Sequence, residues 1–210
     1  MDMEELIESF PRNHKKYEHI FYSLQKTRKI FLTESIDSEM ASAIVGNLIL
    51  FDAEGSDKPI FLYINSIGGL VNGLYAIHDA IQMITAPVHT ICIGEACSCA
   101  AIILASGSKG CRFATENSRI LIHQLSVEGI EGKGSDIELE AEEIKKVNKL
   151  MFELLARHTG QFYNKILEDC ENDKWFSAEE ARSYGIIDKI IKPVKQLPRL
   201  RRKRSGNKGQ

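Results

Sequence analysis

The sequence lacks any hydrophobic run long enough to cross a bilayer, and its positive and negative charges nearly cancel. Its longer apolar stretches, such as residues 100–105, fall far short of the ~20 residues that a transmembrane helix requires. The formal net charge of −2 over 210 residues gives no overall attraction to nucleic acid. The acidic start, MDMEE, has no cationic segment, so we expect no secretory signal. We therefore expect neither a membrane nor a nucleic-acid partner.

Cysteine is scarce, and a nucleotide-binding loop is absent from the sequence. The spacing of Cys97 and Cys99 lacks a second pair of metal ligands, so we expect buried side chains there rather than a metal site. No G-x-x-x-x-G-K-[ST] motif occurs, so any dependence on ATP must come from a partner, and we expect no cofactor. An odd number of cysteines indicates reduced thiols and a cytoplasmic location, with the plastid stroma or mitochondrial matrix as the alternative. The five cysteines are Cys92, Cys97, Cys99, Cys111 and Cys170.

Length and composition favour a single folded domain with two appendages. Hydrophobic residues make up 43% and charged residues 27% of the chain, as in ordinary globular proteins. Residues 1–26 are polar and aromatic without clear periodicity, and we predict that they form an N-terminal arm. Residues 27–192 carry the regular hydrophobic patterns of a domain. Residues 193–210 are basic and have no apolar pattern, which predicts a disordered tail.

Segments with strand and helix patterns alternate along the domain. Asp37 is a candidate helix N-cap, and the S-x-x-E sequences that start at Ser135 and Ser177 are typical capping boxes. The alternation indicates an α/β fold with mostly right-handed crossovers. Strands are predicted at residues 30–32, 60–64, 88–93, 119–124 and 186–191. Helices are predicted at residues 38–51, 71–84, 100–105, 135–158, 162–170 and 178–184.

Three residues have surroundings that suit acyl-transfer chemistry. Ser98 lies in GEACSCAA (94–101), between a β-branched strand and a helix of small residues. His123 ends an apolar strand, and Asp173 lies just before an aromatic pair. A serine hydroxyl becomes a good nucleophile only with a base in hydrogen-bond reach, and that base needs an acid to fix its tautomer. These three residues could supply the three roles.

Alternatives remain open at this point. Taken alone, His123 at a strand end would more readily be a core histidine. Asp169, four residues before Asp173, is a competing acid. Cys97 and Cys99 flank the serine and are conceivable nucleophiles. The order Ser, His, Asp matches no generic hydrolase motif, so spacing does not settle the assignment.

The domain resembles the family of Clp protease proteolytic subunits over residues 27–192. Several separated motifs carry the resemblance in the right order: IFLT (30–33), YINSIGG (63–69), the segment around the serine, RILIHQ (119–124), HTGQ (158–161) and ENDKWFSA (171–178). The resemblance implies an α/β fold, the ClpP/crotonase-like spiral of ββα units with a protruding helical handle. It implies catalytic roles for three residues: Ser98 as nucleophile, His123 as general base and then acid, and Asp173 as the group that orients the imidazole.

An oxyanion hole is expected beside the nucleophile. The N–H of Cys99 follows Ser98 at the N-terminus of a predicted helix, where backbone N–H groups can stabilise a developing negative charge. The resemblance supplies Gly69 as the second donor, because a glycine lets the backbone approach a substrate closely. Without the resemblance, the glycine pair could equally be an ordinary strand-to-helix turn.

The resemblance further implies a serine endopeptidase subunit of a barrel-shaped, ATP-dependent protease that hydrolyses unfolded polypeptides. Seven subunits would form a ring, two rings a tetradecamer, and an AAA+ Clp unfoldase would dock on the ring face. Segment 127–134 would align an extended peptide beside the site, and the helix from residue 135 would stack the two rings. Five residues match the positions at which the family binds its unfoldase, although they could equally belong to the core: Phe61, Tyr63, Met83, Ile91 and Phe113.

Several positions depart from the family pattern. Ile67 and Leu125 stand where prolines are usual, and Cys97 and Cys99 replace alanine and methionine. Proline presets backbone angles, so its loss leaves the oxyanion turn less preorganised. The departures suggest a divergent paralogue in mixed rings with a second subunit type, and the alternative function is a weakly active or inactive structural or regulatory ring subunit. An acyl-CoA hydratase or isomerase of the same superfamily is a third interpretation, but it needs no Ser-His pair.

Overall fold

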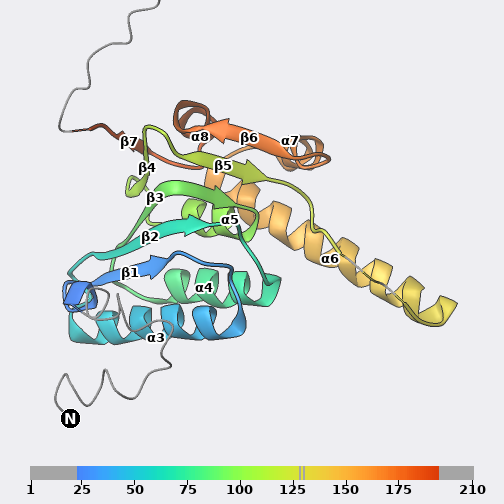
Figure 1. Cartoon of the computed structure of the whole chain (residues 1–210), viewed down its shortest axis with the longest axis horizontal. Helices are drawn as coiled ribbons and strands as arrows, with labels where there is room; N and C mark the ends of the chain where they lie inside the picture. Colours follow the sequence, from blue (N-terminus) through green and yellow to red (C-terminus); the bar gives the residue numbers. More distant parts are fainter. Residues whose placement is uncertain (1–22, 128, 130, 194–210) are drawn as a thin grey trace, which may run out of the picture.

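The computed structural model describes residues 23–127, 129 and 131–193, and a seven-stranded sheet lies at its centre (Figure 1). Five strands follow the order β1-β2-β3-β4-β7, and β5 pairs with both β3 and β6. Every pairing is parallel except that of β5 with β6. The strands are β1 (Lys29–Leu32), β2 (Ile60–Ser66), β3 (Val88–Cys97), β4 (Arg112–Thr115), β5 (Arg119–Ile122), β6 (Lys174–Ser177) and β7 (Lys189–Ile191).

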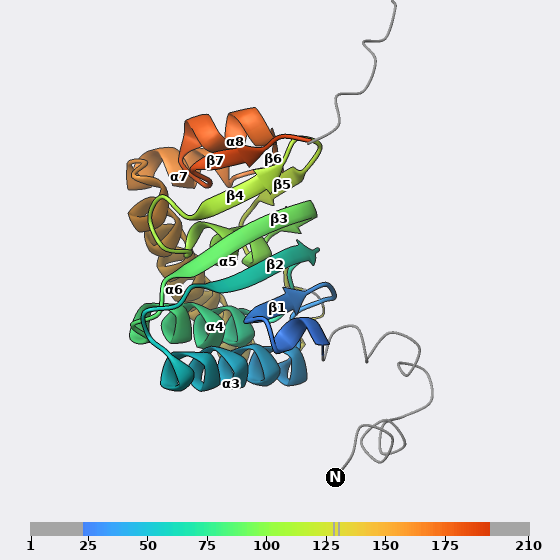
Figure 2. The same cartoon turned by 90° about the vertical axis from the view of Figure 1, so that its left-hand side faces the viewer.

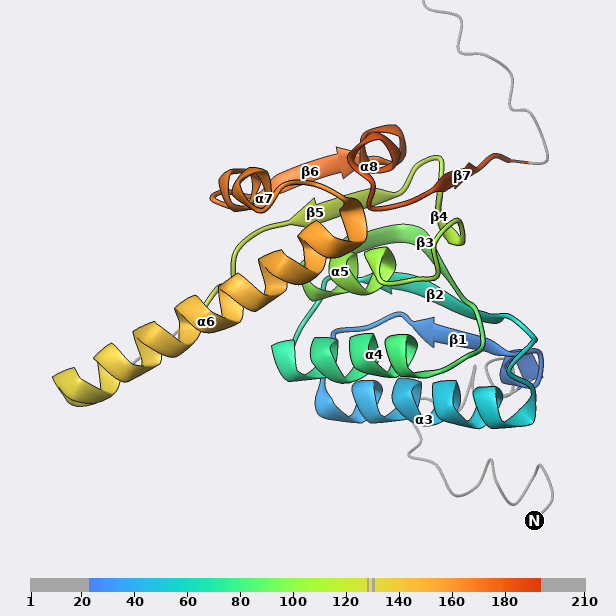
Figure 3. The same cartoon turned by 180° about the vertical axis from the view of Figure 1, so that it is seen from behind.

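Helices cover one face of the sheet. Figures 1 and 3, which view the molecule from opposite sides, place α3, α4, α5 and α6 on the same side of the strands. Figure 2 shows the strands side by side, with α3 beyond β1 and α8 beyond β7. In β2, Ile60, Leu62 and Ile64 are buried, whereas Phe61 and Tyr63 between them are half-buried, so alternate residues face opposite sides of the sheet. The helices are α3 (Ser38–Glu54), α4 (Val71–Met83), α5 (Cys99–Ala105), α6 (Gly134–Thr159), α7 (Tyr163–Asp169) and α8 (Ala178–Tyr184).

The predicted α/β architecture is confirmed, and so are two of the three predicted helix caps. The Asp37 carboxylate accepts a hydrogen bond from the N–H of Met40 (2.7 Å) at the start of α3. Ser177 and Glu180 form the capping box of α8. The capping box at Ser135 is wrong, because α6 already begins at Gly134 and Ser135 lies inside its first turn. A serine inside the first turn cannot act as the N-cap, which must precede the helical residues.

Two strands were not predicted from the sequence. Neither β4 (RFAT) nor β6 (KWFS) was predicted, because neither contains the run of three apolar residues that marks the equally short β1 (KIFL) and β5 (RILI). The last strand was predicted from residue 186, but the paired residues begin at Lys189. In contrast β3 is longer than predicted and continues to Cys97, directly before the candidate nucleophile.

The helix α6 projects from the body of the molecule, as the predicted handle does (Figures 1 and 3). Residues 134–140 are all exposed, and the fully buried residues of α6 begin only at Met151. Within the described residues no helix is both long and apolar enough to cross a bilayer. Most of the predicted arm (1–26) and tail (193–210) lies outside the described residues, as do positions 128 and 130 of segment 127–134.

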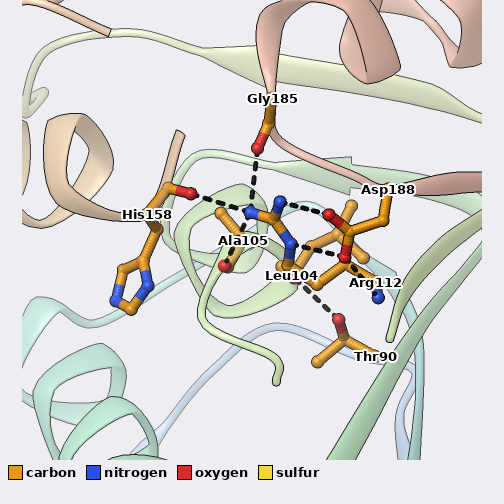
Figure 4. Close-up of polar contacts among 7 residues, drawn as sticks. All are labelled: Thr90, Leu104, Ala105, Arg112, His158, Gly185 and Asp188. Atoms are coloured by element: carbon orange, nitrogen blue, oxygen red, sulfur yellow. Dashed lines mark hydrogen bonds and ion pairs between the residues drawn. The ribbon is translucent and has the colours of Figure 1, made fainter. Parts of the chain in front are cut away.

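The buried Arg112 on β4 ties the ends of several helices together (Figure 4). Its guanidinium donates to the carbonyl oxygens of Ala105 (3.3 Å), His158 (2.8 Å) and Gly185 (2.8 Å), near the ends of α5, α6 and α8. It also donates to both carboxylate oxygens of Asp188, at 2.9 and 2.6 Å. The last carbonyls of a helix have no partner within the helix, so this one side chain satisfies backbone groups of three helices.

Candidate active site

The register of three neighbouring strands brings Ser98, His123 and Asp173 to one edge of the sheet. Cys97 at the end of β3 lies opposite Leu121 of the parallel strand β5, and the N–H of Ser98 donates to the Leu121 carbonyl (2.9 Å). Because β5 and β6 are antiparallel with Ile122 opposite Lys174, the next residues in each direction are His123 and Asp173. The candidate residues therefore follow β3, follow β5 and precede β6, respectively.

The backbone of Ser98 is held in an unusual conformation. Its φ is 56° and its ψ is −125°. A positive φ costs free energy in any residue that carries a side chain. Ser98 is the N-cap residue of α5, but its hydroxyl forms no capping hydrogen bond. Persistent strain of this kind clusters at functional sites, where surrounding structure fixes it. The first N–H groups of α5, which have no partner within the helix, follow this residue directly.

The imidazole of His123 lies close to the carboxylate of Asp173. His123 Nδ1 is 3.8 Å from Asp173 Oδ1, and the side chains are 23% and 67% exposed, respectively. This separation is too long for a hydrogen bond. No hydrogen bond between the Ser98 hydroxyl and His123 is present among the described residues. Catalytic hydrogen bonds are often long without substrate and shorten when it binds, so this geometry is compatible with proton transfer.

The competing acid, Asp169, is engaged elsewhere. Its carboxylate, 8% exposed, accepts hydrogen bonds from Lys165 (3.0 Å), Lys174 and the Tyr184 hydroxyl (2.7 Å). Burial raises the pKa of Asp169, but the hydrogen bonds from Lys174, Tyr184 and Lys165 outweigh it and leave the pKa below its ordinary value. With these three donors in place, Asp169 is unsuited to orient His123, and Asp173 is the carboxylate in contact with it.

A glycine turn between β2 and α4 packs directly against the serine. A Cβ atom on Gly68 would lie 2.8 Å from the Ser98 Cβ and 3.2 Å from the Cys99 nitrogen, and its φ is 98°. Gly69, with φ of 148°, forms an isolated parallel bridge with Ile36. The structure thus brings both expected oxyanion donors, Gly69 and Cys99, next to Ser98. Sequence reasoning missed Ile36, which lies on a distant loop and has no chemically distinctive side chain.

The cysteines beside the serine are poor nucleophiles in this setting. Burial and the neighbouring Glu95 raise the pKa of the Cys97 thiol to about 12. Burial also raises the pKa of Cys99, an effect only partly opposed by the Ser98 hydroxyl and by the backbone of Gly69 and of Cys99 itself. Because the thiolate is the reactive form of cysteine, both thiols are protonated and inert near neutral pH.

Four of the five predicted docking residues share the face of the sheet that no described helix covers. Tyr63, Ile91 and Phe113 lie in one row across β2, β3 and β4. Phe61, Tyr63 and Phe113 are half-buried, whereas Ile91 is only 6% exposed. Met83 lies apart from the row, at the end of α4, and is 69% exposed.

Two aromatic neighbours of this row were missed by the sequence patterns. Phe31 stacks on Tyr63, with ring centroids 5.3 Å apart. The ring of His89 lies 4.9 Å from that of Phe61 and 5.9 Å from that of Phe113. The alternation of side chains along β1 and β3 could have placed both on this face.

The groups at the site are those of acyl transfer. Among the described residues, no set of three or more His, Cys, Asp or Glu side chains is arranged to hold a metal ion. The site offers a hydroxyl, an imidazole, a carboxylate and backbone N–H groups, which are the parts that nucleophilic attack on a carbonyl requires.

Comparison with known proteins gives a consistent result. The family model described as Clp protease matches residues 12–194. The chain is 47% identical over 171 residues to ATP-dependent Clp protease proteolytic subunit 3 of Frankia casuarinae, an alignment that covers 81% of this chain and 80% of that protein. Matches of this extent, together with the confirmed fold, show that the chain belongs to the Clp protease family and is a serine peptidase.

Proposed function

We propose that the chain cleaves peptide bonds with Ser98 as nucleophile, His123 as general base and Asp173 as the orienting acid. The observation that carries this proposal is the strand register, which aligns the ends of β3 and β5 with the start of β6. Because His123 Nδ1 faces Asp173, the opposite ring nitrogen, Nε2, is left to receive the serine proton. The carboxylate favours the tautomer with hydrogen on Nδ1 and stabilises the imidazolium that forms.

The reaction proceeds in two acyl-transfer steps. The Ser98 oxygen bonds to the substrate carbonyl carbon while His123 takes the hydroxyl proton, and the carbonyl oxygen becomes an oxyanion. The N–H groups of Gly69 and Cys99 stabilise this charge. His123 then gives its proton to the leaving amine as the C–N bond breaks, and water hydrolyses the acyl-enzyme by the same sequence of proton transfers.

The decisive experiment compares peptide hydrolysis by the full chain with that by Ser98→Ala. We expect the variant to lose roughly 10⁴- to 10⁶-fold in kcat, while particle mass and thermal midpoint stay unchanged. Cys97→Ala is the matched control, because it removes a neighbouring side chain whose thiol is not reactive, and it should keep most of the activity. Full activity of Ser98→Ala would exclude the proposed nucleophile.

Membership of the family implies association with Clp ATPases and assembly into rings. We propose double heptameric rings that receive unfolded polypeptides from an AAA+ unfoldase bound on the helix-free sheet face near Phe61, Tyr63 and Phe113. The domain limits stay a prediction, in which residues 27–192 form the peptidase domain between an arm and a basic tail. Alanine at Tyr63 should weaken stimulation by the unfoldase and leave unassisted peptide cleavage unchanged.

A second candidate function is a structural or regulatory subunit in mixed rings. It is favoured by the 3.8 Å separation of His123 from Asp173 and by Ile67 at the family's proline position. This interpretation predicts no hydrolysis by the purified chain and activation by a second subunit type. Hydrolysis by a pure ring that Ser98→Ala abolishes would reject it.

A further inference from the structure

The loop after β1, residues 34–36, is a built-in support for the oxyanion turn, and we infer that Ser35 is a positioning residue for catalysis. Ser35 holds the Gly68 carbonyl and thereby keeps the N–H of Gly69 directed at the site. This inference rests on the proposed function, because it concerns a donor of the same oxyanion hole. Ser35 itself is not placed to contact the substrate carbonyl.

The backbone pairing of Ile36 sets the orientation of Gly69. The Ile36 N–H donates to the Gly68 carbonyl (2.8 Å), and the Ile36 carbonyl accepts from the N–H of Leu70 (2.7 Å). In such a parallel bridge, the residue between the two bonded positions directs its own N–H and carbonyl to the opposite side. The N–H and carbonyl of Gly69 therefore point away from Ile36 and toward the start of α5.

Contacts on the other side agree with this orientation. The Cys99 thiol donates to the Gly69 carbonyl (3.3 Å). The N–H of Gly69 reaches no oxygen acceptor within the described part of the chain. A Cβ on Gly69 would lie 2.4 Å from the Ile36 oxygen, so the close approach of the loop is possible only because residue 69 is glycine. The turn is thus clamped, and the N–H of Gly69 is left free for an oxyanion.

The Ser35 hydroxyl adds a second bond to the same carbonyl. It donates to the Gly68 oxygen at 3.2 Å, beside the Ile36 N–H. Since a trans peptide holds its carbonyl and the following N–H antiparallel, fixing the Gly68 oxygen fixes the direction of the Gly69 N–H. The Ser66 hydroxyl completes the clamp by accepting from the Gly68 N–H (3.2 Å) and donating to the Glu34 carbonyl (2.6 Å).

The residue at position 67 explains why side-chain hydrogen bonds are needed here. A proline there would restrict the backbone through its ring, but this chain has Ile67, which leaves φ free. Ile67 is 65% exposed and is not at positive φ, so neither burial nor a left-handed backbone excludes a proline at this position. Hydrogen bonds from the loop then supply the rigidity that the ring would have supplied.

The test is a double-mutant cycle between Ser35→Ala and Ile67→Pro, measured on the assembled full-length protein. One neutral hydrogen bond predicts a loss of about 3- to 10-fold in kcat for Ser35→Ala, with KM unchanged. Ser35→Thr should restore kcat, and Ile67→Pro should remove at least about half of the Ser35→Ala effect, because the two devices fix the same backbone. Ser42→Ala is the control, since the Ser42 hydroxyl only bonds the Ser38 carbonyl within α3.

Amide hydrogen exchange of residues 66–70 supplies a readout independent of turnover. Among the variants, only Ser35→Ala should show faster exchange than the unchanged protein. An unchanged kcat in Ser35→Ala, or a loss that Ser35→Thr and Ile67→Pro leave untouched, would overturn the inference. A loss accompanied by equal loss of assembly would also overturn it. Ser98→Ala is measured in parallel: if it remains active, the proposed function fails, and if it is inactive while Ser35→Ala is normal, only the positioning role fails.

Discussion

Gly68 is the residue whose replacement should damage the site most directly. A Cβ there would meet the Cys97 carbonyl oxygen at 2.7 Å and the Ser98 Cβ at 2.8 Å, at a φ that disfavours side chains. Gly68→Ala must therefore move the nucleophile or the oxyanion turn. We expect a loss of at least about 100-fold in kcat, comparable to removal of an oxyanion donor, measured by peptide hydrolysis.

Gly46 offers the matched glycine for this experiment. It lies inside α3, and a Cβ added there would meet nothing within 4 Å beyond the adjacent backbone of its own helix, so Gly46→Ala should keep full activity. It should also stabilise the fold by about 0.5–1 kcal/mol through helix propensity. Normal activity of Gly68→Ala would show that the turn tolerates a side chain beside Ser98.

The half-buried His158 should make the stability of the folded protein sensitive to acid. Burial, the facing His78 (Nε2 to Nε2, 2.9 Å), and the nearby Arg112 and Arg157 lower the pKa of His158 to about 4. The unfolded chain binds the proton near pH ~6.5, so stability should fall as the pH drops from ~6.5 toward ~4. As the pH falls, the urea midpoint of unfolding should decline less steeply in His158→Gln than in the unchanged protein. Equal slopes for the two proteins would contradict the role of His158.

At the residue scale, the sequence could name candidates but not their contacts. Ser98, His123 and Asp173 were named from their motifs, and their catalytic roles stay predictions. The occupation of Asp169 by two lysines and a tyrosine depends on how α7 and α8 pack, which no local pattern reveals. The support of the glycine turn by Ser35 and Ile36 is equally non-local, because it joins the loop after β1 to the loop after β2.

At the scale of elements, the Arg112 network should dominate the stability of the helix layer. Burial raises the pKa of Asp188, but hydrogen bonds from Arg112 outweigh it and lower the pKa, so Asp188 stays charged. Arg112→Met would leave three helix-end carbonyls without their donor and would remove the cation from this carboxylate, which keeps only backbone donors such as the N–H of residue 112. We expect a loss of about 3–5 kcal/mol in the free energy of unfolding, measured with urea.

A surface ion pair provides the comparison for Arg112. Arg182 and Glu179 on α8 are 2.6 Å apart, but both side chains are at least half exposed, so Arg182→Met should cost less than about 1 kcal/mol. Adding Asp188→Asn to Arg112→Met should recover part of the loss, because the unpaired charge disappears. Equal effects of the two arginine substitutions would refute the special role of the buried one.

The elements themselves were predictable where their apolar patterns were clear. The helices from α3 to α8 and the strands β1, β2, β3 and β5 were located within a few residues. The short strands β4 and β6 were missed because pairing, rather than their own composition, makes them strands. The start of α6 was displaced by one residue, because a serine followed by an acidic residue resembles a cap even inside the first turn.

At the scale of the whole molecule, the handle α6 exposes apolar side chains that a compact monomer would not need. Leu139 is 68% exposed and Ile137 40% exposed on its projecting half. We expect Leu139→Asp to split the proposed double rings into single rings, because the proposed stacking would bury a charge where two handles meet. Light scattering should show about half the mass, whereas Lys146→Asp, at an exposed position of α6, should leave it unchanged.

The position of β6 has a consequence for the order in which the protein is made. Ser98 leaves the ribosome well before Asp173, and synthesis proceeds at about 5–20 residues per second with N-terminal parts folding first. The antiparallel pairing of β6 with β5 is the step that carries Asp173 to His123. A nascent chain therefore displays the proposed nucleophile without its proposed orienting carboxylate, so with this assignment translation itself delays the onset of proteolysis until nearly the whole domain has been synthesised.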